Sequence, residues 1–159
     1  MHKKLIAAVL FLFVATASLA MVHKGTQNER EGLLISHYGQ EILVDGSILA
    51  KETFVGELAD GKGDVTNHEY QGILLKHLLE DCEIEVLDDN NVIITSADNY
   101  SVEFSAEEVN AENQLYLAVE ADGKVLKDID GQDGGIQVII FGDPNSKRCV
   151  RCVAKIAVK

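Results

Sequence analysis

The sequence predicts a single β-rich α+β domain, with mixed and antiparallel strands and one main covering helix. Short runs in which apolar and polar positions alternate occupy most of the chain, and this pattern is typical of half-buried strands. Turn signals such as Asp-Gly separate these runs. After the N-terminus, only residues 70–82 repeat their apolar side chains at helical spacing. A chain of 159 residues is long enough for one domain with a substantial core.

The first twenty residues are typical of a secretory signal peptide. Lys3 and Lys4 form a basic region, an apolar run covers residues 5–17, and small residues precede an expected cleavage after Ala20. The alternative is an uncleaved anchor, although the apolar run is shorter than the roughly 20 residues that a bilayer span needs. Both alternatives predict an exported domain, which is periplasmic, extracellular or anchored on the outer side of the membrane.

The expected organisation is a signal peptide at 1–20, a flexible lead with the first strand at 21–39, and the folded domain at 40–159. The net charge is −12 at pH 7, and it becomes −14 when Lys3 and Lys4 leave with the signal peptide. Such an acidic surface repels nucleic acid and anionic lipid headgroups. We therefore expect neither nucleic acid nor a membrane surface as a partner. A small molecule is the expected ligand, and nothing in the sequence identifies a protein partner.

In the first half of the domain, short strands are expected at 33–35, 41–44 and 53–55, followed by a glycine-rich loop at 60–64. Residues 70–82 then predict an amphipathic helix, because their apolar side chains fall on one face. That apolar face consists of Leu74, Leu75, Leu78, Leu79 and Cys82.

The second half predicts strands separated by local turn and capping signals. Strands are expected at 92–95 and 100–104, and Ser105 with the acidic pair that follows predicts a short capped helical turn. A hairpin is expected at Asp122-Gly123, between strands at 115–120 and 124–126.

The last two strands have different patterns. Residues 136–141 are apolar on both faces, which predicts a central strand. The run from Val150 to Val158 alternates, with Cys152 on its apolar side and Arg151 on its basic side.

The order of these motifs resembles the oxidoreductase molybdopterin-binding domain, which has the sulfite oxidase fold. Tyr70-Gln71-Gly72, with Leu75 and Leu78-Leu79 after it, is similar to that family's Tyr-x-Gly-x-x-Leu-x-x-Leu-Leu signature. Ala97-Asp98-Asn99-Tyr100-Ser101-Val102 is similar to its Ala-Asp-Gly-Tyr-x-Val turn, with asparagine in place of glycine. The ending from Gly134 to Ile156 is similar to its glycine loop, apolar strand and final alternating run. The resemblance covers residues 40–158.

The resemblance implies the fold, and molybdopterin as a cofactor only by analogy. In catalytic members of the family, a cysteine in the N-terminal half of the domain binds molybdenum, and arginines contact the pterin phosphate. This chain has neither cysteine nor arginine between Tyr38 and Tyr70. We therefore expect a domain without a molybdenum ligand, without catalytic residues and with no bound cofactor.

Cys149-Val150-Arg151-Cys152 is the sharpest chemical pattern in the sequence. A redox Cys-x-x-Cys normally opens a helix, which lowers the pKa of one thiol. Here the pair falls on an expected strand, where residues three apart point to opposite faces. The favoured interpretation is a pair of unreactive thiols. A disulfide involving one of them, and a small redox protein that uses Cys149 and Cys152 or a bound cofactor, remain open.

If the domain binds a ligand, the resemblance points to Tyr70, Tyr100 and Arg148. Arg148 belongs to a basic cluster in an acidic domain, and in the family this region borders the ligand cleft. The glycine-rich loop at 131–135 could approach an anion through its backbone amides, although its aspartates favour a simple turn. No spacing typical of a metal site occurs. A third interpretation is a structural, partner-binding module.

Overall fold

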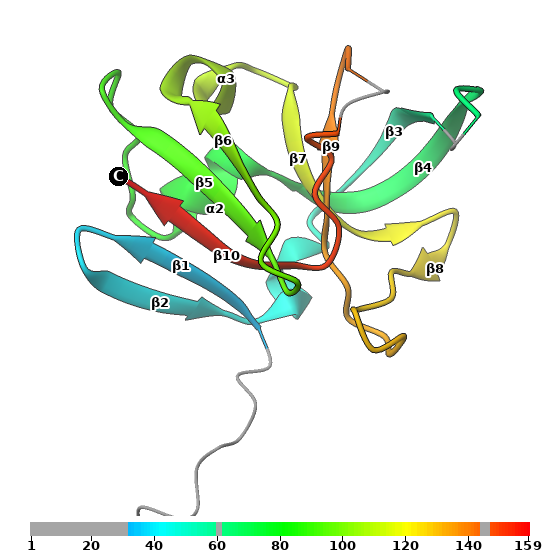
Figure 1. Ribbon diagram of the computed structural model, residues 1–159, viewed down its shortest axis with the longest axis horizontal. Helices are drawn as coiled ribbons and strands as arrows, with labels where there is room; N and C mark the ends of the chain where they lie inside the picture. Colours follow the sequence, from blue (N-terminus) through cyan, green and yellow to red (C-terminus); the bar gives the residue numbers. More distant parts are fainter. Residues whose placement is uncertain (1–31, 60–61, 144–146) are drawn as a thin grey trace, which may run out of the picture. The chain divides into compact units, whose positions relative to one another are not determined.

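A computed structural model describes residues 32–59, 62–143 and 147–159. The expected signal peptide and its cleavage site lie outside these residues. Within them, the chain from Gly32 to Lys159 forms one compact unit of two sheets and three short helical segments (Figure 1). None of the described helices has both the length and the apolar character that a membrane span requires.

The first sheet has five strands in the order β2-β1-β10-β5-β6. The pair β1–β10 is parallel, and the other three pairs are antiparallel. Its central strand is therefore the one that comes last in the sequence (Figure 1). The strands are β1 (Leu33–His37), β2 (Gln40–Val44), β5 (Asn91–Ser96), β6 (Ser101–Ser105) and β10 (Val153–Val158).

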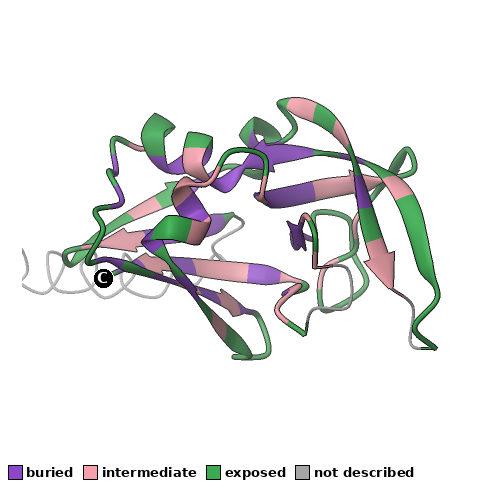
Figure 2. Cartoon of the chain, turned by 90° about the horizontal axis from the view of Figure 1, so that it is seen from above, coloured by how far each residue is buried: buried purple, intermediate pink, exposed green. Residues whose placement is uncertain are grey.

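The second sheet is antiparallel and is centred on β7, which pairs with β4, β8 and β9. The pair β3–β4 forms a long hairpin, and Figure 2 shows how its distal part is exposed while the other end of β4 is buried. The strands are β3 (Glu52–Ala59), β4 (Val65–Leu74), β7 (Leu115–Ala121), β8 (Lys124–Val125) and β9 (Gln137–Ile140).

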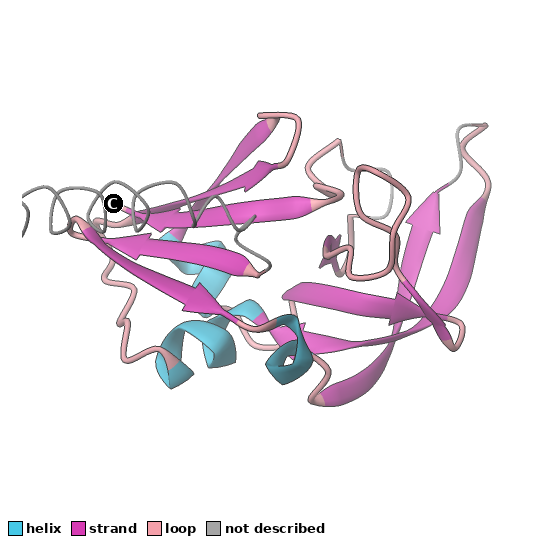
Figure 3. Ribbon diagram, turned by 90° about the horizontal axis from the view of Figure 1, so that it is seen from below, coloured by secondary structure: helices cyan, strands magenta, loops and turns pink. Residues whose placement is uncertain are grey.

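The helical segments are short, as the cyan ribbons in Figure 3 show. Ser105 begins α3 with a complete capping box, in which its hydroxyl accepts from the Glu108 amide and the Glu108 carboxylate accepts from the Ser105 amide. This confirms the capped turn that the sequence predicts. The segments are η1 (Gly46–Leu49), α2 (Leu75–Asp81) and α3 (Ala106–Asn110).

The predicted helix at 70–82 is correct only in its second half. Residues from Tyr70 to Leu74 belong to β4, and α2 begins at Leu75. Tertiary structure decides this, because Tyr70 to Leu74 pair with β7 as a strand. Gly72 lies so close to β7 that an added Cβ would sit 2.2 Å from the Leu117 carbonyl oxygen. For these residues, strand pairing and burial outweigh the intrinsic helix propensity.

The predicted central strand at 136–141 is β9, which is fully buried but pairs with only one strand, β7. Its other side is covered by the segment before β10, since the Val138 amide donates to the Val150 carbonyl at 2.8 Å. That same segment interrupts the predicted alternation from 150 to 158. Cys152 has a φ of 51°, and the register with β5 shifts between Val153 and Lys155.

The buried apolar side chains form two clusters. The main one includes Leu75, Leu78 and Leu79 of α2, so the helix contributes to the core as the sequence predicts. The second cluster belongs to the second sheet and is rich in aromatic rings. It consists of Tyr70, Leu74, Tyr116, Ala118 and Ile139, with Phe54, Ala121, Leu126 and Phe141 packed around them.

Candidate functional site

Of the three residues predicted to bind a ligand, the structure brings Tyr100 and Arg148 to the same segment. The Tyr100 hydroxyl donates to the Lys147 carbonyl at 2.8 Å. The Arg148 guanidinium donates to Glu108 at 2.7 Å and lies 4.5 Å from the centre of the Phe104 ring. Both side chains therefore fix residues 147–148 against β6 and α3. The pKa of Glu108 is lowered, since the Ser105 amide and Arg148 together outweigh the opposing effect of burial.

Replacing Arg148 by alanine removes both the ion pair with Glu108 and the contact with Phe104. We expect the free energy of unfolding to fall by about 1–2 kcal/mol, measured by urea denaturation. Lys155→Ala is the matched control, because its 3.7 Å pair with Glu41 lies on the surface and should contribute less than about 0.5 kcal/mol. Equal losses in the two variants would contradict the anchoring role of Arg148.

Tyr70, the third predicted residue, lies apart from that pair in the second sheet. It is 2% exposed and stacks on Phe54 at 5.5 Å between ring centres. Burial is the main cause that raises the pKa of its phenol, with Asp122 as the next largest. Tyr70 is therefore a core side chain of the aromatic cluster.

The three cysteines are free thiols with different surroundings. Cys82 follows α2, and both it and Cys149 pack against the main cluster. The Cys152 thiol faces the Lys127 carbonyl at 3.7 Å. Burial raises the pKa of all three thiols, which is the opposite of the shift that a reactive cysteine needs. Cys149 and Cys152 precede β10 in an irregular segment, so the prediction that they lie on a strand is wrong.

We expect denatured, non-reduced protein to contain three titratable thiols per chain, because all three cysteines are free. Ellman's reagent in guanidinium chloride measures this number, and a sample reduced beforehand and desalted is the control. A value of one thiol in the untreated sample would reveal an internal disulfide and contradict the prediction.

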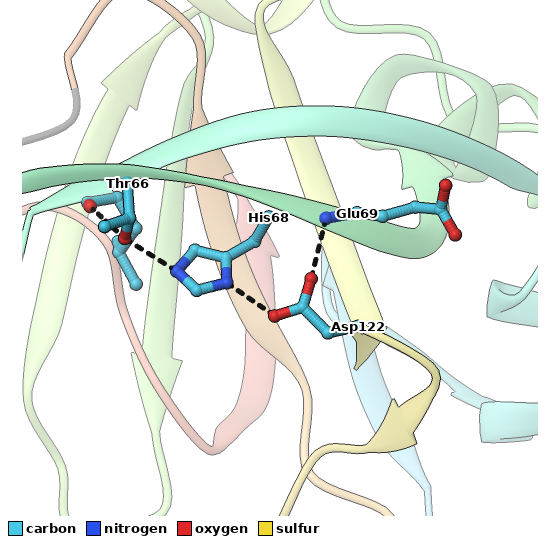
Figure 4. Close-up of polar contacts among 5 residues, drawn as sticks. Thr66, His68, Glu69 and Asp122 are labelled. Atoms are coloured by element: carbon cyan, nitrogen blue, oxygen red, sulfur yellow. Dashed lines mark hydrogen bonds and ion pairs between the residues drawn. The ribbon is translucent and has the colours of Figure 1, made fainter.

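A polar cluster joins β3, β4 and the turn after β7 (Figure 4). The His68 ring contacts Asp122 through Nδ1 at 2.7 Å and the Thr66 hydroxyl through Nε2 at 2.9 Å. Asp122 also accepts from the Glu69 amide at 3.0 Å. Sequence spacing does not reveal this cluster, since Asp122 is 54 residues from His68. The only local signal is that residues 66 and 68 share a face of a strand.

The order hydroxyl, imidazole, carboxylate is the geometry of a nucleophile activated by a base. Here a structural role accounts for the cluster. An ionised carboxylate only accepts, so His68 Nδ1 carries a hydrogen. When the ring is neutral, Thr66 donates to Nε2; when it is protonated, Nε2 donates to Thr66, whose hydroxyl turns to the Leu58 carbonyl. These residues line neither the pocket beside α2, nor that beside the β1–β2 turn, nor that at Gln137, and we assign them to holding the β3–β4 hairpin.

The hydrogen bond from His68 is the main cause that lowers the pKa of Asp122 below its ordinary value of 3.8. A lowered pKa adds stability that is complete above pH 3.8 and is lost as pH falls through the folded-state value. We therefore expect Asp122→Asn to melt below the parent at neutral pH, and the gap to close in acid. Thermal unfolding followed by circular dichroism between roughly pH 7 and pH 2.5 measures it. A gap that stays constant would contradict this role.

Backbone amides in and next to the glycine-rich loop at 131–135 bind the carboxylate of Asp128, which precedes the loop. The amides of Asp130 and Gln132 donate to Asp128 at 3.0 and 2.7 Å. Asp133 pairs with Lys127 at 2.7 Å. The backbone amides that could have met an external anion are therefore occupied, and the loop acts as a turn that folds back over Leu126.

The residues on either side of this loop line a pocket of about 200 Å³, which we call the Gln137 pocket. Gln137 is 8% exposed, and its Nε2 has no partner among the described residues. Arg151 lies opposite it through an isolated antiparallel bridge. The sequence does contain one signal for this site, a glutamine within an apolar run. The lining residues are Leu126, Lys127, Ile136, Gln137, Arg151 and Cys152.

Two comparisons with known proteins agree with this architecture. A family model described as the oxidoreductase molybdopterin binding domain matches residues 47–158. The crystal structure of the sulfane dehydrogenase SoxCD from Paracoccus pantotrophus aligns with a TM-score of 0.60 and 16% sequence identity. The alignment covers 83% of this chain and 39% of that chain, so this chain spans well under half of its length. No curated protein matches the sequence.

At 16% identity, the likeness to the sulfane dehydrogenase shows the fold alone. The family match covers most of the chain, from η1 to the end of β10, and it includes the Tyr70–Gly72 signature, the 97–102 turn and the Gln137 pocket. The chain belongs to the oxidoreductase molybdopterin-binding domain family.

Proposed function

We propose that this chain is an exported, non-catalytic domain that binds a small molecule on the molybdopterin-binding fold. The observation that carries the proposal is the Gln137 pocket, where a buried amide nitrogen has no partner among the described residues. An unpaired buried donor costs stability, so a ligand that pairs with it gives a reason for its presence. Export is supported by the signal-like pattern of residues 1–20.

The described residues do not fit a molybdenum cofactor held by a cysteine. A cysteine binds a metal as its thiolate, and burial disfavours that form by raising the pKa of Cys82, Cys149 and Cys152. Two further pockets lie beside α2 and beside the β1–β2 turn, and of these three only the Gln137 pocket is lined by a cysteine. Its volume of about 200 Å³ is below the roughly 300–1,000 Å³ of pockets for drug-sized ligands.

The proposal is tested by purifying the full chain after expression with its own leader in a host that makes molybdenum cofactor. We expect metal analysis to find less than about 0.1 molybdenum per chain and the absorption spectrum to show no cofactor band. Stoichiometric molybdenum, or a coloured cofactor that survives gel filtration, would overturn the non-catalytic assignment and favour a redox enzyme.

Ligand binding is tested on the same preparation with a panel of small carboxylates, amides, oxyanions, nucleobases and metal ions. We expect at least one organic compound of the panel to raise the melting temperature in a dose-dependent manner, because binding to the folded state alone stabilises it. An unchanged melting temperature across the whole panel would contradict the proposed function.

A further inference from the structure

Two buried side-chain nitrogens of the described residues lack a hydrogen-bond partner, Nε2 of His37 and Nε2 of Gln137, and of these two residues only Gln137 is buried as a whole. Asn90 and Ser96 are also buried, at 4% and 5% exposed, and both are paired. The Asn90 amide donates to the Lys159 carbonyl, and the Ser96 hydroxyl donates to Asp98. Only the Nε2 of Gln137 lacks a partner among these three residues. Buried polar groups are normally satisfied, so this amide defines where a ligand acceptor belongs.

Arg151 supplies a positive charge beside that amide. The two residues are direct partners in an antiparallel bridge, and the Val138 amide bonds to the Val150 carbonyl next to it at 2.8 Å. Directly opposed residues in antiparallel strands project to the same face, with Cβ atoms about 4.5–5.5 Å apart. The Arg151 guanidinium forms no hydrogen bond or ion pair with any residue of the described ranges. The buried Gln137 and the exposed Arg151 therefore both contribute to one side of the pocket lining.

Of the other charges around the pocket, Lys127 is paired with Asp133, whereas the carboxylates of Asp128 and Asp98 keep their negative charge near Cys152. The Lys127–Asp133 distance is 2.7 Å, and Asp128 accepts from the loop's own amides. The Cys152 thiol is directed at the Lys127 carbonyl. Arg151 is thus the positive charge available to a ligand, and it favours an anion.

The remaining lining of the pocket is mixed, with Lys127 and Cys152 beside two apolar residues. Leu126 and Ile136 supply its apolar lining. A volume of about 200 Å³ corresponds to roughly seven water molecules at about 30 Å³ each. Such a space suits a ligand of roughly five to eight non-hydrogen atoms, with one charged end and a short apolar body.

We propose that the Gln137 pocket binds a short aliphatic carboxylate, with its carboxylate accepting from Gln137 Nε2 and pairing with Arg151, and its carbon chain against Leu126 and Ile136. This inference rests on the proposed function, because it names the ligand class of the same site. A tetrahedral inorganic oxyanion would satisfy the donors but leave the apolar lining without contact, so the pocket favours the organic acid.

The test uses the full chain labelled with ¹⁵N and titrated with sodium butyrate, followed through the side-chain amide signals of Gln137. We expect a saturable shift with butyrate. Butyramide, which has the same shape without charge, and sodium sulfate, which has charge without a carbon chain, should bind at least about tenfold more weakly.

Three variants separate the pocket from general charge effects. Gln137→Leu and Arg151→Gln should each weaken butyrate binding about tenfold or more, as for loss of a charge-assisted hydrogen bond. Lys155→Gln also removes one positive charge, on the first sheet, and should bind like the parent. Gln137→Leu should melt about 3 °C above the parent, because an apolar side chain replaces an unpaired amide. This last result also shows that the variant is folded.

Unchanged butyrate binding by Gln137→Leu, or sulfate binding as tight as butyrate, would overturn the inference. If no carboxylate binds but another compound of the panel does, the ligand class is wrong and the proposed function stands. If nothing in the panel binds, both fail.

Discussion

Gly72→Ala is expected to lower the free energy of unfolding by about 3 kcal/mol and the melting temperature by roughly 10 °C. A Cβ at this position would lie 2.2 Å from the Leu117 carbonyl oxygen and 3.0 Å from the Ala118 Cα. Both atoms belong to the backbone of β7, so no side chain can rotate away to relieve the contact. The strands must separate at the bulge between Gln71 and Gly72, where β4 joins β7.

Gly46→Ala is the matched control for this substitution. An added Cβ there has no heavy atom within 4 Å, and the position begins the short helix η1. Its effect should stay within about 0.5 kcal/mol. Urea and thermal unfolding of both variants, followed by circular dichroism, give the comparison. A Gly72→Ala protein that melts with the parent would show that β4 does not approach β7 as closely as described.

Gly135→Ala is expected to open the Gln137 pocket and to lower the free energy of unfolding by about 2 kcal/mol. The added Cβ would lie 2.1 Å from the Lys127 carbonyl oxygen and 2.4 Å from its carbon. The same carbonyl oxygen accepts a hydrogen bond from the Cys152 thiol. Displacing it would release Cys152, which should then react with a thiol reagent about tenfold faster.

The rate of Cys152 modification in native protein, identified by peptide mass after digestion, measures this effect. Gly46→Ala is again the control, and its Cys152 should react at the parental rate. Faster reaction at Cys82 as well would indicate general loosening of the fold, whereas the described contact predicts an increase confined to Cys152. An unchanged Cys152 rate would contradict the role assigned to Gly135.

The parts of the fold that the sequence predicts well depend on neighbouring residues. Ser105 and Glu108 are three positions apart and cap α3. Asp122 and Gly123 both have positive φ and form the turn between β7 and β8. The family resemblance adds the overall architecture, because it uses the order of several such motifs at once.

The parts that the sequence predicts poorly depend on partners far along the chain. Tyr70 to Leu74 have the apolar spacing of a helix start, but their pairing with β7 makes them a strand. The Gln137 pocket needs Arg151 brought opposite Gln137 by an isolated bridge. A glutamine in an apolar run signals an unusual position, but only the three-dimensional structure shows that its amide nitrogen lacks a partner.

The position of β10 in the first sheet has a consequence for how the domain assembles. The hairpins β1–β2 and β5–β6 make no strand pairing with each other, and β10 joins them by pairing with β1 on one side and β5 on the other. Since β10 follows all of these strands in the chain, no fragment that ends before Val153 contains a complete first sheet. Assembly of this sheet must wait until residues 153–158 have been synthesised, and contacts of such long sequence separation close slowly.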